Sequence, residues 1–198
     1  MLTELDVINA CLATMSEMPL VELDDDHPLV ASARQNFKEA LVKEMGLKWW
    51  FNTDFLSLKQ ANDKFIYVPQ DAVSCVPLYR DDLTMRGRRL YDRYNGTYEI
   101  TGPIDVYVIR NIPFEELPLP AQILVRDRTV LDFQMNYDGD ELRTRKLEEA
   151  YARSYRQVNA ENTRQLNINV FRMQETMRAR HRAGYRTSRV GRNFGGLR

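Results

Sequence analysis

In this 198-residue chain, the best candidates for functional residues are arginines that lie near aromatic residues in the sequence. Their chemistry suits the binding of a partner. One such set lies near the C-terminus: Arg178, Arg180, Arg182, Tyr185, Arg186, Arg189, Arg192 and Phe194. Guanidinium groups bind carboxylates and phosphates through paired hydrogen bonds, and the rings add small apolar anchors. The segment has too few apolar residues to fold alone. We therefore expect it to bind a partner, with a groove in a protein favoured over nucleic acid.

A second set of arginine and tyrosine residues lies in a predicted hairpin: Arg86, Arg88, Arg89, Tyr91, Arg93 and Tyr94. This set would contact nucleic acid or a neighbouring subunit, and the alternative is a solvated edge strand protected by its charges. Trp49 and Trp50, at the start of the first predicted strand, leave a similar choice. They would form a stacking platform for a base or pack inside the protein, and packing is the favoured interpretation.

A catalytic constellation is absent from the sequence. Its two histidines, His27 and His181, have no partner at metal-ligand spacing, and no Cys/His cluster suggests zinc. Phosphate-binding loops and hydrolase or metalloprotease signatures are also missing. The acidic run 24–26 could hold a divalent cation, although capping of the following helix is the commoner role of such residues. We predict that the protein is not an enzyme and holds no cofactor or metal.

Charge is divided unevenly along the chain. The sequence holds 28 Lys and Arg residues against 28 Asp and Glu residues, so its formal net charge is +0. Residues 143–198 carry 14 of the basic residues but only 4 acidic ones, and residues 1–142 hold 14 basic and 24 acidic residues. A basic segment joined to an acidic body is typical of a chain that docks on an acidic partner or a polyanion.

Composition points to an ordinary globular protein. Its apolar content of 43% permits a sizeable core in one domain or two small lobes. Cys11 and Cys75 lie in apolar patterns, which predicts buried free thiols in a reducing compartment. The chain lacks a hydrophobic run of the ~20 residues that cross a bilayer, and its N-terminus lacks the features of a signal peptide. We therefore expect a soluble protein with no membrane partner.

Helices are predicted on both sides of the central part of the chain. Apolar residues recur every three to four positions over residues 3–15, where Thr3 can cap a helix. Asp26 and Pro28 suit the start of a second helix, which Gly46 would end. Helical periodicity returns after Pro120 and continues, past a break at 139–140, to about residue 170.

The middle of the chain is different, because aromatic and β-branched residues alternate with turn signals over residues 48–110. The strand candidates are WWFNTDFLSL, KFIYV, AVSCVPLYR, RLYDRY, TYEIT and IDVYVIR. Asn95–Gly96 is the strongest hairpin turn. These patterns predict an α+β fold with three parts: a helical bundle lobe (1–47 and 116–172), an inserted small antiparallel β lobe (48–115) and an extended, flexible Arg-rich C-terminal tail (173–198).

Five segments carry a resemblance to a known family: VINACLATMSEMPLVELDDD (7–26), ARQNFKEALVKEMGLKWWFNTD (33–54), IYVPQDAVSCV (66–76), RRLYDRYNGTYEI (88–100) and IRNIPFEELP (109–118). They combine an Ala/Leu-rich helix that turns into an acidic loop, an aromatic strand start, and a tyrosine-rich hairpin. Over most of residues 1–170 the chain resembles the tail tubular protein A family, the head-to-tail adaptor (gatekeeper) of short-tailed, podovirus-type bacteriophages.

The resemblance implies a structural virion protein without catalytic activity. Twelve copies would form a ring that joins the capsid portal to a tail nozzle of the tail tubular protein B type and surrounds the DNA channel used in genome ejection. The ring would assemble in the host bacterial cytoplasm and belong to the virion tail.

The resemblance also suggests roles for the two arginine sets. Family members engage the portal through C-terminal segments, so the set from Arg178 to Phe194 would bind the portal. The hairpin set would face a subunit or the nozzle, and contact with the channel DNA stays open. The alternative function is that of a small nucleic-acid-binding protein using the Arg-rich C-terminus, whose binding would weaken steeply with salt.

Overall fold

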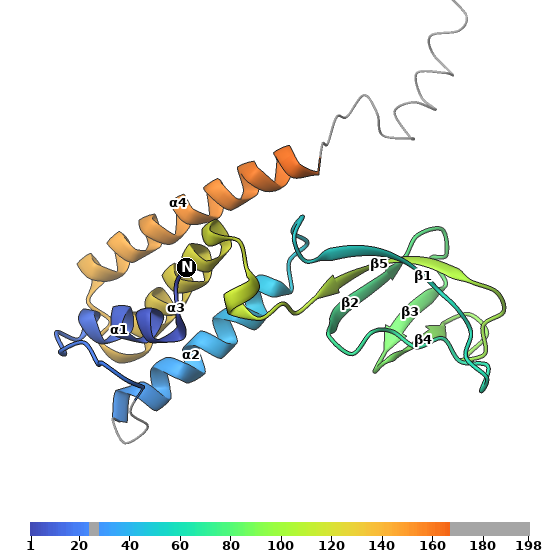
Figure 1. Ribbon diagram of the computed structural model, residues 1–198, viewed down its shortest axis with the longest axis horizontal. Coiled ribbons are helices and arrows are strands. Elements are labelled where there is room, and N and C mark those ends of the chain that lie inside the picture. Colours follow the sequence, from blue (N-terminus) through green and yellow to red (C-terminus); the bar gives the residue numbers. More distant parts are fainter. Residues whose placement is uncertain (24–27, 167–198) are drawn as a thin grey trace, which may run out of the picture. The chain divides into compact units, whose positions relative to one another are not determined.

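The computed structural model describes residues 1–23 and 28–166 (Figure 1). Over these residues the chain forms four α-helices, five β-strands and one short 3-10 helix, which confirms the predicted α+β class. The chain divides into two compact units, Met1–Asn159 and Ala160–Arg198. The second unit contributes the last turns of α4 (Glu141–Gln165), where Arg164 pairs with Glu161 at 3.0 Å. The packing described below belongs to the first unit.

Helix α1 (Glu4–Thr14) begins at the predicted cap. The Thr3 hydroxyl accepts a hydrogen bond from the Asp6 backbone N–H at 3.2 Å, and the Asp6 carboxylate accepts one from the Thr3 N–H at 2.8 Å. This reciprocal pair satisfies two donors that a helix start would otherwise leave unpaired. The buried side chains of α1 lie on one face: Val7, Ile8, Cys11 and Leu12.

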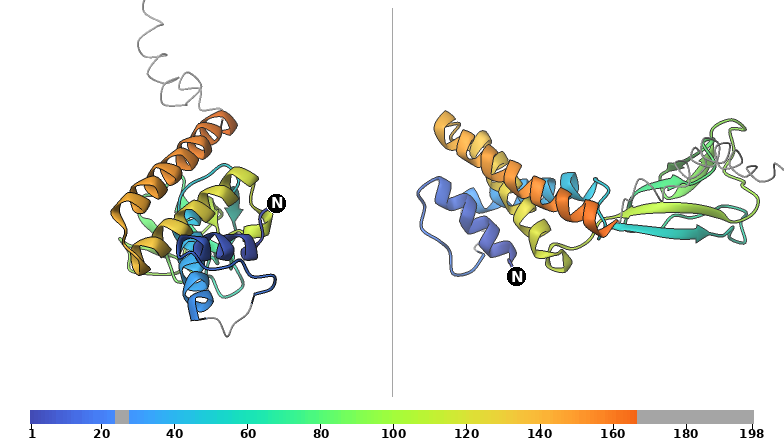
Figure 2. Two further views of the ribbon diagram at one scale, coloured as in Figure 1. Left: turned by 90° about the vertical axis from the view of Figure 1, so that its left-hand side faces the viewer. Right: turned by 90° about the horizontal axis from the view of Figure 1, so that it is seen from above.

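Helices α2 (Pro28–Met45) and α3 (Leu119–Tyr137) complete the main core. As predicted, α2 starts at a proline and ends just before Gly46, whereas Asp26 lies outside the described residues. Contacts join α1, α2 and α3 pairwise, and α4 runs alongside them (Figure 2). The buried residues of this core include Val7, Ile8, Leu12, Val30, Phe37, Met45, Phe114, Val125 and Phe133.

Helix α4 packs differently, because of its 25 residues only Ser154 and Val158 are buried. Asp140 caps its start by accepting the N–H groups of Leu142 and Arg143. Three side-chain contacts, which we call the polar seam, fasten α4 to the other helices: Tyr151 to Glu44 of α2, Ser154 to Asp127 of α3, and Arg143 to the Thr14 carbonyl of α1. These polar contacts add to a narrow apolar contact in which Val158 and Tyr151 pack with Trp49 and Leu124.

The segment between α2 and the first strand is organised by Asn52, which is 1% exposed. Its side-chain oxygen accepts the Trp49 N–H at 2.9 Å, and its amide nitrogen donates to the carbonyls of Met45 and Leu47, both at 3.0 Å. Trp49 is buried against Leu124 and Val158. The strand predicted to begin at Trp49 thus starts only at Thr53, because Asn52 holds the preceding residues in a turn.

Three strands form an antiparallel sheet in the order β1-β5-β2: β1 (Thr53–Leu58), β5 (Ile104–Arg110) and β2 (Ala72–Pro77). One face covers a second hydrophobic core that includes Ile66, Cys75, Leu83, Leu90, Val106 and Val108. The opposite face carries side chains paired across the three strands, with Phe55 and Val76 both opposite Tyr107. Arg110 ties the sheet at one end through ion pairs to Asp54 and Asp71 at 2.6 and 2.7 Å.

Strands β3 (Leu83–Arg86) and β4 (Arg89–Asp92) form a separate two-stranded hairpin. Its turn is Gly87–Arg88, where Gly87 has a φ of 60° that favours glycine. The predicted turn at Asn95–Gly96 is present as well, closed by the Asp92–Thr97 bridge, with Gly96 at a φ of 67°. The predicted strands KFIYV and TYEIT are wrong as strands, because in the structure these segments make only isolated bridges.

Candidate interaction surfaces

Arginine and aromatic side chains alternate on one side of the β3–β4 hairpin. The Arg86 guanidinium lies 3.9 Å from the centre of the Tyr91 ring, and Tyr91 meets Tyr98 at 4.8 Å. Arg89 lies between the rings of Tyr98 and Phe65, at 4.4 and 5.0 Å. We call these five residues the Arg–Tyr ladder. A guanidinium stacked on a ring keeps its N–H edge available for a carboxylate or phosphate.

The structure thus brings together three of the six hairpin residues singled out in the sequence: Arg86, Arg89 and Tyr91. The others lie outside the ladder. Arg88 occupies the exposed turn and its side chain has no hydrogen bond or ion pair among the described residues. Arg93 instead donates to the Asp81 carbonyl, and Tyr94 is 82% exposed in the following turn.

Two members of the ladder, Phe65 and Tyr98, are not predictable from the local sequence pattern. They reach the ladder from the bridge between Phe65 and Glu99, a pairing between distant segments. Local alternation of residue types carries no signal for such a pairing.

The buried Asp92 fixes the turn that follows the ladder. Its carboxylate accepts hydrogen bonds from the backbone N–H groups of Tyr94 and Asn95, each at 2.9 Å, and from the Asn95 side chain at 2.8 Å. These bonds, with those from Asn95 the strongest, hold the pKa of Asp92 below its usual value. The turn is therefore held rigid around a charged carboxylate.

A second candidate surface is the outer face of the three-stranded sheet. Phe55 is 67% exposed and meets the Tyr107 ring at 6.4 Å, and the Lys48 ammonium lies 4.1 Å from the centre of that ring. Val76 continues the row on the other side of Tyr107. This arrangement is an exposed apolar row with a cation at its side.

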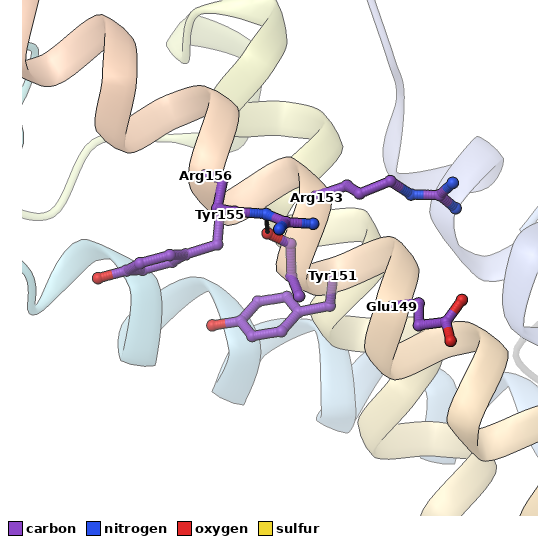
Figure 3. A pocket seen from close by; sticks show the side chains of 6 residues that line it. Glu149, Tyr151, Arg153, Tyr155 and Arg156 are labelled. Atoms are coloured by element: carbon purple, nitrogen blue, oxygen red, sulfur yellow. Dashed lines mark hydrogen bonds between the residues drawn. The ribbon is translucent and has the colours of Figure 1, made fainter.

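A third candidate surface is a shallow groove on α4, of about 490 Å³, lined by Glu149, Tyr151, Ala152, Arg153, Tyr155 and Arg156. Figure 3 shows the two tyrosine rings extending to one side of the helix and Glu149 and Arg153 to the other. The Arg156 Nε donates to the Ala152 carbonyl at 3.1 Å. We call this feature the α4 groove.

The groove rests on the buried Glu44 of α2, which is 2% exposed. The Tyr151 hydroxyl donates to Glu44 Oε1 at 2.8 Å, while Oε2 has no hydrogen-bond partner in the described part of the chain. Burial raises the pKa of Glu44, and the Tyr151 bond and the charge of Arg128 oppose that rise. Arg128 lies 5.3 Å from the Tyr151 ring centre and pairs with Asp132 at 3.0 Å.

Other predicted groups have simpler outcomes. Cys11 and Cys75 are buried free thiols, as expected, and burial raises their pKa values to about 12 and about 11. The C-terminal set from Arg178 to Phe194 and the acidic run 24–26 lie outside the described residues. Over residues 1–23 and 28–166 no three His, Cys, Asp or Glu side chains converge as metal ligands. Within those same ranges, none of the helices has the length and apolarity to span a bilayer.

Comparison with known proteins gives the class of this molecule. A family described as "Tail tubular protein" matches residues 5–180, which is most of the chain. The molecule is therefore a structural protein of a bacteriophage tail, and such a role favours a non-catalytic function.

The chain belongs to the tail tubular protein family. It is similar to tail tubular protein A of Klebsiella phage KP34, with 24% identity over 134 residues, which cover 67% of this chain and 72% of that protein. The family that the five sequence segments suggested is thus confirmed, and the protein is a component of the virion tail.

Proposed function

We propose that this tail protein is a head-to-tail adaptor: a ring of twelve copies that joins the capsid portal to the tail nozzle and surrounds the DNA channel. The observation that carries the proposal is the extent of the family match, which runs from residue 5 through the helices and strands into the basic C-terminal region. The similarity to a tail tubular protein A supports the same assignment.

We assign the three parts of the chain different tasks in this ring. The helical lobe (1–47 and 116–172) would form the body of the ring, and the β lobe (48–115) would present the Arg–Tyr ladder and Arg88 to a neighbouring subunit or to the nozzle. The separate hydrophobic cores of the helices and strands support this division. The tail (173–198) would bind the portal through its arginines, because guanidinium groups pair well with acidic grooves.

Assembly by repetition is the mechanism that we propose for the joint. Each tail need bind the portal only weakly, because a ring binds through all its copies at once and the binding of each copy raises the effective concentration of the next. Such a joint would be close to irreversible without any single strong contact.

The first test is size. The purified full-length protein, alone and mixed with its portal, is examined by light scattering and negative-stain imaging. We expect a monomer or weak oligomer alone and a ring in the mixture. A protein that stays monomeric in both samples contradicts the adaptor proposal.

The second test removes the tail after Arg172. We expect a folded protein that no longer sediments with portals, and co-sedimentation at normal salt would show that the tail is not the docking element. If the full-length protein binds bare DNA as tightly as the portal, and loses that binding between low and moderate salt, the nucleic-acid alternative replaces the adaptor.

The third test addresses the hairpin. Arg86→Glu with Arg88→Glu should weaken attachment of the nozzle or closure of the ring, because both side chains are exposed and neither forms an ion pair among the described residues. Lys59→Glu, also at an exposed position of the strand region, is the matched control. If particles carrying the double variant have normal tails, the hairpin is not an interface, and the alternative of a solvated edge strand is favoured.

A further inference from the structure

The loop after α1 projects apolar side chains from a fixed backbone. Met18 and Val21 are 83% and 89% exposed. Between them, the Asn9 side chain accepts the Leu20 N–H at 2.8 Å and donates to the Leu20 carbonyl at 3.0 Å. These two bonds anchor the loop backbone to α1 at Leu20, between the two exposed side chains.

Acidic residues flank the apolar side chains of this loop. Glu17 and Glu22 are exposed and form no ion pair within the described ranges. We call residues 17–22 the acidic knob. Its combination of exposed apolar groups and unpaired carboxylates suits a partner surface that is apolar at its centre and basic at its rim.

The α4 groove has that composition. Tyr151, Ala152 and Tyr155 supply an apolar floor, and Tyr155 is still 37% exposed. At the rim, Arg153 and Arg156 have no carboxylate partner in the part of the chain that is described. Figure 3 shows Arg156 next to Tyr155, whereas Arg153 extends to the side of α4 opposite the tyrosine rings, so the two arginines line different edges of the groove.

We propose that the acidic knob of one copy docks into the α4 groove of a second copy. Met18 and Val21 would cover the tyrosine rings, while Glu17 and Glu22 would pair with the arginines. Glu149 lies at the other end of the groove and repels carboxylates, so it sets the direction in which the knob enters. The assignment deepens the proposed adaptor function, because it rests on the ring and names the contact between its subunits.

The acidic knob and the α4 groove are unlike surfaces, so copies joined through them associate head to tail. A contact in which one patch meets an unlike patch leaves a free knob on one copy and a free groove on the other. Further copies then add in the same manner, and the series stops when the rotation closes a ring. The proposed contact is therefore compatible with a closed ring of many copies.

Cysteine cross-linking tests the contact directly in the full-length chain. Val21→Cys and Ala152→Cys are introduced together, at two exposed positions. The native Cys11 and Cys75 are buried, so they do not compete under mild oxidation. We expect a ladder of disulfide-linked oligomers, both at high concentration and with the portal. Val21→Cys combined with Tyr79→Cys, at an 84% exposed position that does not line the groove, is the control that should give no ladder.

Charge exchange supplies an independent readout, the self-association constant from sedimentation velocity. Reversal of the knob (Glu17→Arg, Glu22→Arg) should weaken association about tenfold, and reversal of the rim (Arg153→Glu, Arg156→Glu) should do the same. The four changes together should restore most of the loss, because opposite charges face each other again. Failure of the combined variant to recover overturns the pairing.

The possible results distinguish a failure of the knob-and-groove contact from a failure of the ring proposal. Oligomers or portal-bound rings that form without a cross-link between positions 21 and 152 overturn the knob-and-groove contact and leave the ring standing. A protein that never associates, with or without the portal, overturns the ring and the contact together.

Discussion

Replacement of Tyr151 by Phe removes one contact of the polar seam, together with the interaction of the same hydroxyl with Arg128. The change removes only the hydroxyl that donates to Glu44 Oε1 and keeps the ring in place. A hydrogen bond to a charged group contributes about 1.5–3 kcal/mol. Because Glu44 Oε2 already lacks a partner among the described residues, the variant leaves a buried carboxylate without a side-chain donor there. We expect a loss of about 2 kcal/mol in the free energy of unfolding at pH 7.

The loss should depend on pH. Burial raises the folded-state pKa of Glu44 above its unfolded value, so the protonated carboxyl is favoured by folding and this contribution to stability is lost as pH rises through the folded pKa. The Tyr151 bond lowers that pKa, so Tyr151→Phe raises it further. The variant should therefore lose most stability at neutral pH and less near pH 4, where the carboxyl is protonated in both proteins.

Thermal unfolding followed by circular dichroism measures the effect. For a chain of this size each kcal/mol lowers Tm by roughly 2–4 °C, so about 4–8 °C is expected at pH 7. Tyr155→Phe is the matched control, because its hydroxyl has no hydrogen-bond partner among the described residues and its Tm should change little. An unchanged Tm for Tyr151→Phe at pH 7, or an equal loss at both pH values, would refute the reasoning about Glu44.

Three further predictions concern the core, a cap and the thiols. Phe133→Ala opens a cavity at a fully buried position and should lower the free energy of unfolding in urea by about 3–5 kcal/mol; a loss below 1 kcal/mol would contradict the described packing. Thr3→Ala removes half of the capping box with Asp6 and should lower stability by about 1 kcal/mol, whereas Thr3→Ser should retain most of it. Cys11 and Cys75 should react with a thiol reagent only after unfolding, since burial raises their pKa values to about 12 and about 11; rapid reaction of the native protein would place a thiol at the surface.

Helix boundaries were predictable from the sequence because their signals are local. A cap at Thr3, a proline at Pro28 and glycines at Gly46 and Gly139 act within a few residues of the boundary that they set. The structure places α1, α2 and α3 within a residue or two of these positions. The strand from Ile104 to Arg110 was also found in full, since its β-branched and aromatic residues alternate without interruption.

The strand region was less predictable because its pairings are long-range. The turn at Asn95–Gly96 was expected to join two long strands, but it closes a single bridge, and the regular hairpin turns at Gly87–Arg88 instead. The sequence predicted that a strand begins at Trp49. In the structure Trp49 precedes the strand, and its backbone N–H donates to the Asn52 side chain. A side chain that bonds the backbone three residues away overrides the β propensity of the aromatic run.

The same contrast between local signals and long-range contacts applies to the candidate surfaces. Arg86 and Tyr91 face each other across neighbouring strands of one hairpin, so the basic-aromatic pattern predicted that part of the ladder. The α4 groove could not be predicted from the sequence, because helical periodicity alone does not distinguish its residues from the rest of a long helix. The role of Tyr151 depends on its hydrogen bond to the buried Glu44 of α2, more than 100 positions away.

The sparse burial of α4 sets the order in which the molecule opens. Local unfolding of a segment costs the free energy of the contacts that it breaks, and amide hydrogens exchange with solvent in proportion to that opening. Because only Ser154 and Val158 of α4 are buried, opening of α4 exposes less apolar surface than opening of α3, and that surface lies mainly around Trp49 and Leu124. Its amides should exchange well before those around Phe133 in α3. A pull on the chain beyond residue 166 would reach this helix first, and α4 could yield while the packing of α1, α2 and α3 stays intact.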